Sequence, residues 1–285
     1  MVGLENGTRL SWWQWPTVLS LDAPIVVMTW QILLASVAGV RLGWPHGFVL
    51  AASVWLSYSA DRWIEGWRLA PAAIRTARHS FYQRRRWLLF VIWLAVLAAD
   101  MAVALTRLSR QELVTGWLVV PPVLAYLLSH QLIHRNHPWR VPKEICVALL
   151  LGCGAAVFPI AGAGVYRRTV WLALGLFVAL AFANCALISV WEAEVDRSHG
   201  QTSLALQFVG HSWIHGLPWL LAGLAALFVL GGGNLRVAAV CSVGSAILLG
   251  IVDVLHLRLG WRVSRVLADV ALLTPLIAMA FGLVP

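Results

Sequence analysis

Carboxylates gather in two short polar stretches of an otherwise apolar sequence. Asp61 and Glu65 are four residues apart in the first stretch, and Glu192 and Asp196 are four apart in the second. On a helix this spacing places both carboxylates of a pair on one face, one turn apart, while Glu194 points elsewhere. Because like charges at this spacing repel each other, each pair favours a divalent cation or a basic neighbour. A solvated loop that joins two helices is the alternative for the second stretch.

Arginines follow both acidic pairs in the sequence. Magnesium usually takes one or two carboxylates together with phosphate oxygens and water, and arginine offers forked donors to the same phosphates. A diphosphate held in this way is a good leaving group, because metal and arginine stabilise the charge that builds on it as the bond breaks. The residues therefore favour divalent cations whose remaining ligands are phosphate oxygens.

The composition indicates that membrane helices must position these pairs. Of the 285 residues, 60% are apolar and 12% are charged, and the mean hydropathy is +0.80. A soluble domain is typically about half apolar and a quarter charged, so we expect an integral membrane protein. Apolar runs long enough to cross a bilayer predict an all-α fold with nine transmembrane helices. The predicted spans cover about residues 21–40, 46–60, 87–104, 115–132, 144–163, 170–190, 213–230, 237–255 and 263–283.

The segment before the first span is rich in tryptophan, with Trp12, Trp13 and Trp15 in residues 1–20. Tryptophan rings settle at membrane interfaces, so this segment is predicted to lie there. Residues 21–285 are predicted to form a single transmembrane domain.

The distribution of basic residues predicts the orientation in the membrane. Nine spans put the termini on opposite sides, and the larger share of the 21 Lys and Arg residues falls in loops on the side of the N-terminus. The positive-inside rule then predicts a cytoplasmic N-terminus and places both acidic pairs at the cytoplasmic face, with a bacterial-type inner membrane as the expected location. At this position the rest of a diphosphate substrate is expected to be a lipid chain, shielded by the helices.

The two acidic stretches resemble those of the UbiA superfamily of intramembrane prenyltransferases, a nine-helix family with the motifs NxxxDxxxD and DxxxD. Residues 57–66 (SYSADRWIEG) look like the first motif, and residues 192–203, which begin EAEVD, look like the second. The segment RTARH at 75–79 follows where the family usually has a basic segment that contains Arg-Thr. LDAP at 21–24 and PKE at 142–144 are also similar to family members, so the resemblance covers most of the chain.

This sequence departs from the family pattern at several positions. Ser57 stands where the family has Asn, Tyr58 stands where an acidic residue is common, and Glu replaces Asp at Glu65 and Glu192. Glutamate keeps the charge but has a longer side chain, and serine still offers an oxygen ligand. These departures leave the prenyl donor and the acceptor open.

The resemblance implies a site in which a central cavity is closed by a polar cap on the cytoplasmic side. It makes Asp61, Glu65, Glu192 and Asp196 the magnesium and diphosphate site. Candidates for direct phosphate contact are Arg62, Arg75, Arg78, Arg140, Lys143 and Arg197, for which the alternative is a charge that only sets topology. Candidates for the cavity or for ligand contact are Ser57, Tyr58, Asn184 and Ser203, where a helix–helix hydrogen bond is the alternative for Asn184.

The resemblance further implies an enzyme, a prenyltransferase. It would transfer an isoprenyl chain from an isoprenyl diphosphate to an aromatic or lipid acceptor, with Mg²⁺ as cofactor. The expected partners are the isoprenyl diphosphate, a hydrophobic acceptor and membrane lipid, without nucleic acid or an obligate protein partner. A terpene cyclase on the same scaffold is one alternative. A cation transporter and a non-catalytic membrane protein are alternatives from other classes.

Three more carboxylates, Asp100, Asp253 and Asp269, fall inside predicted spans, where ionisable residues are functional candidates by default. Arg265 and Asp269 are four residues apart, so an ion pair within one helix is the simpler interpretation of Asp269. Asp100 has no partner nearby in the sequence.

Overall fold

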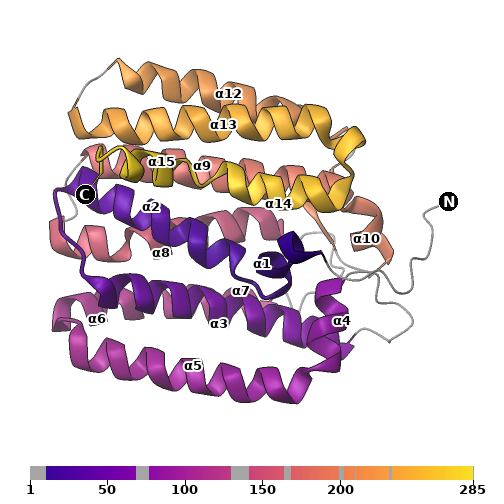
Figure 1. Cartoon of the computed structure of the whole chain (residues 1–285), viewed down its shortest axis with the longest axis horizontal. Helices are drawn as coiled ribbons and strands as arrows, with labels where there is room; N and C mark the ends of the chain where they lie inside the picture. Colours follow the sequence, from indigo (N-terminus) through magenta and orange to yellow (C-terminus); the bar gives the residue numbers. More distant parts are fainter. Residues whose placement is uncertain are drawn as a thin grey trace.

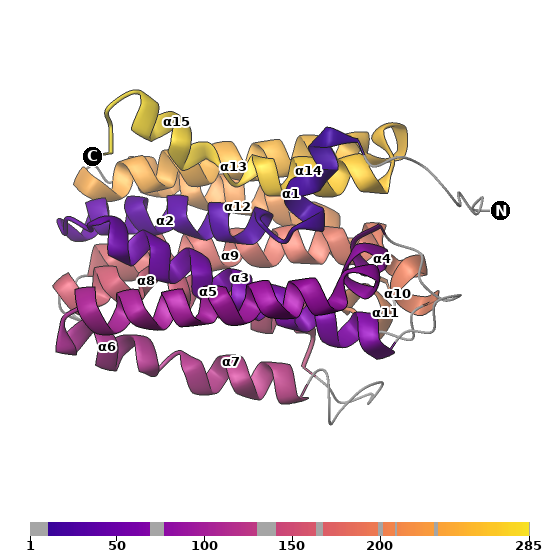
Figure 2. The same cartoon turned by 60° about the horizontal axis from the view of Figure 1, so that its bottom comes forward.

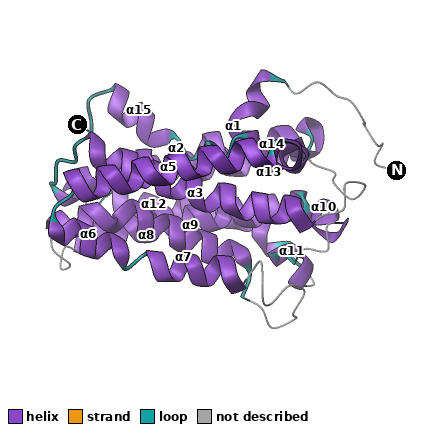
Figure 3. Cartoon of the chain, turned by 90° about the horizontal axis from the view of Figure 1, so that it is seen from below, coloured by secondary structure: helices purple, strands orange, loops and turns teal. Residues whose placement is uncertain are grey.

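A computed structural model describes the chain at residues 11–68, 77–129, 141–163, 168–198, 202–208, 210–230 and 233–284. Within these ranges the regular structure is helical and contains no strand, as Figure 3 shows. The predicted all-α architecture is therefore confirmed for the described residues.

The helices of the N-terminal half run back and forth along the long axis of the molecule (Figure 1). They are η1 (Trp12–Gln14), α1 (Trp15–Val18), α2 (Asp22–Ala38), α3 (Trp44–Arg68), α4 (Ala77–Arg84), α5 (Arg86–Arg107), α6 (Arg110–Trp117) and α7 (Val120–Leu127).

The C-terminal half continues the same pattern and ends at the opposite end of the molecule from α1 (Figure 1). Its helices are α8 (Lys143–Ala163), α9 (Arg168–Trp191), α10 (Ala193–Ser198), α11 (Leu204–Gln207), α12 (Trp213–Val229), α13 (Gly233–Leu259), α14 (Trp261–Ala271) and α15 (Thr274–Ala280).

The long helices lie side by side in an elongated bundle. In Figure 1, α12 and α13 form one edge and α5 forms the opposite edge, with α2, α8 and α9 between them. Figure 2 shows α6 and α7 following each other along a further edge, where both pack on α8. This arrangement places the ends of many helices together at each end of the bundle.

The centre of the bundle is an apolar core built by α2, α8, α9, α13 and α14. Trp30 of α2 stacks on Phe177 of α9, with 4.7 Å between ring centroids and 17° between ring planes. The indole N–H of Trp30 donates to the carbonyl of Leu272 at 2.8 Å, which joins α2 to the segment after α14. Helices α8 and α9 pack so closely that a Cβ at Gly152 would overlap the Val178 side chain.

Length and composition identify several membrane-spanning helices among the described residues. Four helices are long and apolar enough to cross a bilayer: Arg86–Arg107, Lys143–Gly162, Arg168–Trp191 and Leu235–Leu259. Two pairs of consecutive helices, each bent at a short break, raise this number to six if each pair is counted as one span. Trp213–Val229 is a shorter apolar helix. The protein is therefore a multi-pass integral membrane protein, whereas the count of nine spans and the central cavity stay predictions.

Two of the predicted spans are divided into two helices, and in both cases a proline lies in the first turn of the second helix. The span predicted at 115–132 is covered by α6 and α7, and Pro121 lies in the first turn of α7, where its missing N–H is tolerated. The last span divides into α14 and α15, which meet at 42°, and Pro275 begins α15 in the same way. By contrast, α8 continues as one helix through Pro159.

Helix α5 lies at the edge of the bundle, and only 11% of its apolar 18-residue stretch is buried inside the protein. Three polar contacts attach it to α3. Trp93 donates its indole N–H to the carbonyl of Leu56 at 3.0 Å, Ser53 donates to Asp100 Oδ2 at 3.0 Å, and Trp63 donates to the carbonyl of Arg86 at 3.2 Å. The structure thus supplies a partner for Asp100 from another helix, which the sequence did not reveal.

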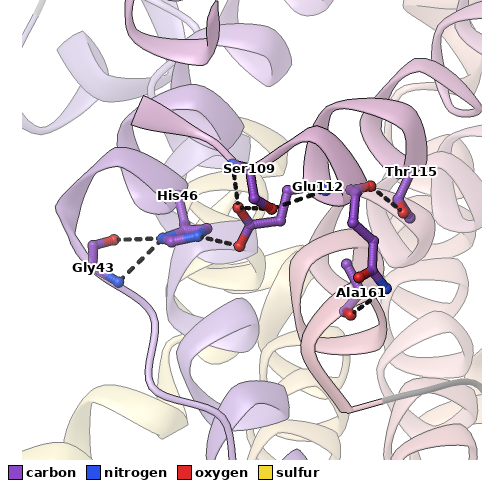
Figure 4. Close-up of polar contacts among 7 residues, drawn as sticks. Gly43, His46, Ser109, Glu112, Thr115 and Ala161 are labelled. Carbon is purple, nitrogen blue, oxygen red and sulfur yellow. Dashed lines mark hydrogen bonds and ion pairs between the residues drawn. The ribbon is translucent and has the colours of Figure 1, made fainter. Parts of the chain in front are cut away.

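A polar cluster at the end of the bundle away from α10 joins α3 to α6 (Figure 4). The His46 ring lies 2.8 Å from Glu112 Oε1, and the second oxygen of Glu112 accepts from the backbone N–H and the hydroxyl of Ser109 at 2.8 and 2.7 Å. Ser109 caps the first turn of α6 in return. Burial would raise the pKa of Glu112, but the hydrogen bonds from Ser109 and His46 lower this pKa below its usual value.

Candidate functional site

Both acidic stretches lie at the same end of the bundle. Asp61 is near the C-terminal end of α3, and Glu192 and Asp196 follow each other through the turn from α9 into α10. Figures 1 and 2 show the end of α3 and all of α4, α10 and α11 at this end. We call it the acidic end.

Backbone hydrogen bonds keep Glu192 and Asp196 in helical register. The N–H of Glu192 bonds to the carbonyl of Ile188, and the N–H of Asp196 bonds to the carbonyl of Glu192, both at 2.9 Å. Both side chains are buried, with 4% exposure each, whereas Glu194 is exposed. The two carboxylates therefore share the inward face of this segment, as their spacing predicts.

Glu192 is held by an arginine from the last part of the chain. Nη1 of Arg265, on α14, lies 2.7 Å from Oε1 and 2.6 Å from Oε2 of Glu192. We expected Arg265 to pair with Asp269 one turn along α14; its hydrogen bonds go to Glu192 instead, although its charge still acts on Asp269. Asp269 instead accepts from the Asn184 side chain of α9 at 3.0 Å. The packing of α9 on α14 brings both acceptors within reach, which the spacing along α14 cannot encode.

Asp196 takes a different basic partner. The Nζ of Lys143, at the start of α8, lies 3.7 Å from Asp196 Oδ2. The next residue, Glu144, is 3% exposed, and its Oε1 accepts from the backbone N–H of Leu204 at 3.1 Å. The charges of Lys143 and Asp196 act on the Glu144 carboxyl. Residues from α8, α10 and α11 therefore meet at this point of the acidic end.

Several buried polar atoms near these carboxylates have no hydrogen-bond partner within the described part of the chain. They are Glu144 Oε2, the hydroxyls of Thr202 and Ser203, Asn184 Oδ1 and Arg265 Nε. Ser203, one of the predicted ligand contacts, is fully buried and precedes α11 directly. Buried polar atoms without partners are rare in folded proteins and are usually satisfied by water or by an ion.

Arg62, a predicted phosphate contact, is hydrogen-bonded to the N-terminal segment. It is 5% exposed, its Nη1 donates to the carbonyl of Thr17 at 2.6 Å, and its guanidinium lies 5.9 Å from the centre of the Tyr58 ring. Trp55 donates to the carbonyl of Leu19 at 2.9 Å, so α3 holds the corner between α1 and α2 at two points. A contact between Arg62 and phosphate stays a prediction.

Tyr82 of α4 completes the attachment of this corner. Its hydroxyl shares a hydrogen bond of 3.0 Å with the hydroxyl of Ser20, a buried residue with a φ of 60°. Burial raises the pKa of Tyr82, although the Ser20 hydrogen bond acts in the opposite direction. The corner at which α1 and α2 meet at 77° is thus fixed by side chains from α3 and α4.

The other predicted site residues are placed as follows. Ser57 donates to the carbonyl of Ser53 at 2.9 Å on its own helix, and Arg197 is exposed. Asn184 joins α9 to α14 through Asp269, which is the helix–helix bond named as its alternative role. Arg75 and Arg140 lie outside the described residues, as do the side chains of Glu65 and Arg78.

Sequence reasoning did not assign two residues to this site, Glu144 and Arg265. Glu144 was noted only as part of the PKE segment that begins α8, and Arg265 was assigned to Asp269. A glutamate in the first turn of a long apolar helix was a usable signal for the first. Nothing in the local sequence indicated that Arg265 reaches Glu192.

The oxygen donors at the acidic end suit magnesium in chemical type. Asp196, Glu144 and Ser203 offer carboxylate and hydroxyl oxygens, which hard divalent cations prefer. A group of three or more His, Cys, Asp or Glu side chains arranged for a metal does not occur among the described residues. Phosphate oxygens and water would therefore have to complete the coordination of a cation bound here.

Comparison with known proteins gives a structural match. No protein-family model and no curated protein matches the sequence. The fold is similar to the apo structure of a UbiA homologue from Aeropyrum pernix K1, with a TM-score of 0.58 and 19% identity over 92% of this chain and 98% of that one. It is also similar to a UbiA homologue from Archaeoglobus fulgidus bound to DMAPP and Mg²⁺, with a TM-score of 0.56 and 14% identity over 95% and 99% of the two chains. The chain has the fold of these UbiA homologues over nearly its whole length.

Proposed function

We propose that this protein, which has the UbiA fold, is a magnesium-dependent prenyltransferase that acts on an isoprenyl diphosphate within the membrane. The observation that carries the proposal is the acidic end, where α3 ends and α10 lies, and where Asp196 is 3.7 Å from Lys143. A fold match to a homologue bound to DMAPP and Mg²⁺ supports the choice of substrate class. The acceptor is a hydrophobic molecule, aromatic or a lipid alcohol.

The carboxylates at this end would hold the cation. Asp61 and Asp196 are the proposed magnesium ligands, together with Glu65 on the last turns of α3, whereas Glu192, which the sequence motif also predicts as a ligand, is paired with Arg265. Magnesium, when bound, supplies positive charge beside the diphosphate and makes it a better leaving group. Lys143, at 3.7 Å from Asp196, contributes a mobile positive charge at the same place.

The apolar helices below the acidic end would protect the reacting carbon from water. The bond between the allylic carbon and the diphosphate oxygen breaks, and the electron pair leaves with the diphosphate. The acceptor then forms a bond to the same carbon and loses a proton to solvent or to a nearby base. Because α2, α8 and α9 are tightly packed and apolar, they would exclude water from the prenyl chain.

We further propose that the acidic end faces the cytoplasm of a bacterial-type cell. The loops and helix ends on this side carry most of the basic residues, including Arg84, Arg85 and Arg197. Residues 1–20 would lie at the interface, and the remainder would form one transmembrane domain. Labelling of single cysteines introduced at exposed positions outside the predicted spans, Arg197 at the acidic end and Arg110 at the other, tests this orientation in intact cells.

Release of diphosphate tests the enzymatic proposal. Purified protein in nanodiscs is incubated with labelled dimethylallyl, geranyl, farnesyl and longer diphosphates, with and without Mg²⁺. We expect release that depends on Mg²⁺ with at least one donor, and analysis of the lipid products separates transfer to an acceptor from cyclisation. Absence of release with every donor, from protein that remains folded, would overturn the proposal.

A further inference from the structure

We infer that the divalent cation on the C-terminal side of the acidic end is held by Glu144 and Asp196 with the hydroxyl of Ser203, and not by Glu192 and Asp196. The inference rests on the proposed function, since it concerns the cation that accompanies the diphosphate. It assigns Glu144 as a ligand that the sequence motifs do not contain. It also gives Arg265 the role of a permanent positive charge beside Glu192.

Glu192 is already neutralised. Its two oxygens face a single nitrogen of Arg265 at 2.6 and 2.7 Å, and both side chains are largely buried. A metal on Glu192 would have to displace this guanidinium and leave it buried beside a dication. Removing one partner from a buried ion pair is strongly unfavourable, so Arg265 keeps Glu192.

Glu144 has one carboxylate oxygen without a hydrogen-bond partner in the described structure, whereas both oxygens of Glu192 contact Arg265. Its Oε1 is fixed by the N–H of Leu204, and its Oε2 is buried without a partner in the described structure. The neighbouring hydroxyl of Ser203 is fully buried and likewise unpartnered, and so is that of Thr202. The Leu204 N–H bond brings the segment at 202–204 to Glu144, and three buried oxygens without hydrogen bonds in these residues indicate that a ligand is expected here.

The charge balance favours a cation as this ligand. Asp196 and Glu144 are both buried, and the negative charge of Asp196 and the positive charge of Lys143 both act on Glu144. Within the described part of the chain, Lys143 faces two buried carboxylates, whose charge a divalent cation would compensate. Carboxylate and hydroxyl oxygens are ligands of Mg²⁺ and Mn²⁺, and phosphate oxygens and water complete such sites.

Lys143 is placed to make way for the cation. Its Nζ is 3.7 Å from Asp196 Oδ2, which is longer than a hydrogen bond, and its side chain is 29% exposed. When a cation occupies Asp196, the ammonium group would turn toward a phosphate oxygen of the bound diphosphate. Lys143 would then contact the substrate while Glu144 contacts the metal.

Binding of Mn²⁺ in the presence of inorganic pyrophosphate tests the assignment without turnover. Electron paramagnetic resonance of free Mn²⁺ is recorded for the full chain in nanodiscs. We expect Glu144→Gln and Ser203→Ala to weaken Mn²⁺ binding by about 10-fold or more, because each removes a ligand oxygen or its charge. Glu192→Gln is expected to lower the melting temperature and leave Mn²⁺ affinity within about 2-fold of the wild type. Exposed Glu194→Gln is the matched control and should change neither quantity.

The outcomes separate this inference from the proposed function. Glutamine at 144 keeps an acceptor for the Leu204 N–H, and the melting temperature reports whether each variant is folded. Wild-type Mn²⁺ affinity in folded Glu144→Gln, or a large loss of affinity in folded Glu192→Gln, overturns the inference and leaves the proposed function standing. If the wild-type protein itself binds neither Mn²⁺ with pyrophosphate nor an isoprenyl diphosphate, both are overturned.

Discussion

Arg265 of α14 binds both carboxylate oxygens of Glu192 across a separation of 73 residues in the sequence. The pair joins the end of the sixth predicted span to the beginning of the ninth. It therefore stabilises the acidic end against separation of α9 from α14, and it makes Glu192 a structural residue as well as part of an acidic motif.

Arg265→Ala should destabilise the protein more than any single change at the exposed arginines. Loss of one partner from a buried ion pair costs about 3–5 kcal/mol, because Glu192 is left charged and buried. Denaturant unfolding in detergent measures the effect, with exposed Arg197→Ala as the matched control at about 0.5 kcal/mol or less. Equal stability of the two variants would contradict the ion pair.

Asp61→Asn and Asp196→Asn should each reduce diphosphate release by about 10²-fold or more without unfolding the protein. Asparagine keeps the size of the side chain but removes the charge that holds a cation. Initial rates with a labelled isoprenyl diphosphate at saturating Mg²⁺ provide the measurement. Near wild-type rates in both variants would contradict the assignment of Asp61 and Asp196 as magnesium ligands.

Arg62→Ala distinguishes a structural role from phosphate contact. The structure gives Arg62 a buried charged hydrogen bond to the carbonyl of Thr17, so its loss should cost about 1.5–3 kcal/mol and expose the corner between α1 and α2 to proteolysis. The Kd for pyrophosphate should remain unchanged. A weaker Kd with unchanged stability and unchanged cleavage would instead establish the phosphate contact.

Glu112 should make stability depend on pH in the acid range. A carboxyl whose pKa is lowered in the folded state stabilises that state above the pKa of the unfolded chain, and this contribution disappears as the pH falls through the lowered pKa. The melting temperature of Glu112→Gln should therefore lie below that of the wild type at pH 7, and the difference should shrink as the pH falls below the ordinary value of 4.5. A difference that stays constant from pH 7 to pH 3 would argue against this contribution.

Much of the fold follows from local sequence. Apolar runs predicted the helices α2, α5, α8, α9, α12 and α13 within a few residues of their observed bounds, because hydropathy and helical hydrogen bonding act along one segment. The breaks between α6 and α7 and between α14 and α15 were not predicted, although prolines stand near both. Whether a proline begins a new helix or continues the old one, as in α8, depends on the packing around it.

By itself, the sequence determined that this is a helical membrane protein with two acidic pairs, and that Glu192 and Asp196 share one helical face while Glu194 does not. These properties depend on spacing within a turn and on the transfer of side chains out of water. Only the tertiary structure decided that Glu192 belongs to Arg265, that Asp196 lies with Lys143 and Glu144, and that Arg62 holds the N-terminal corner. A buried charge is satisfied by whichever opposite charge or donor the packing of distant helices brings within about 3 Å, and spacing along the chain does not record that choice.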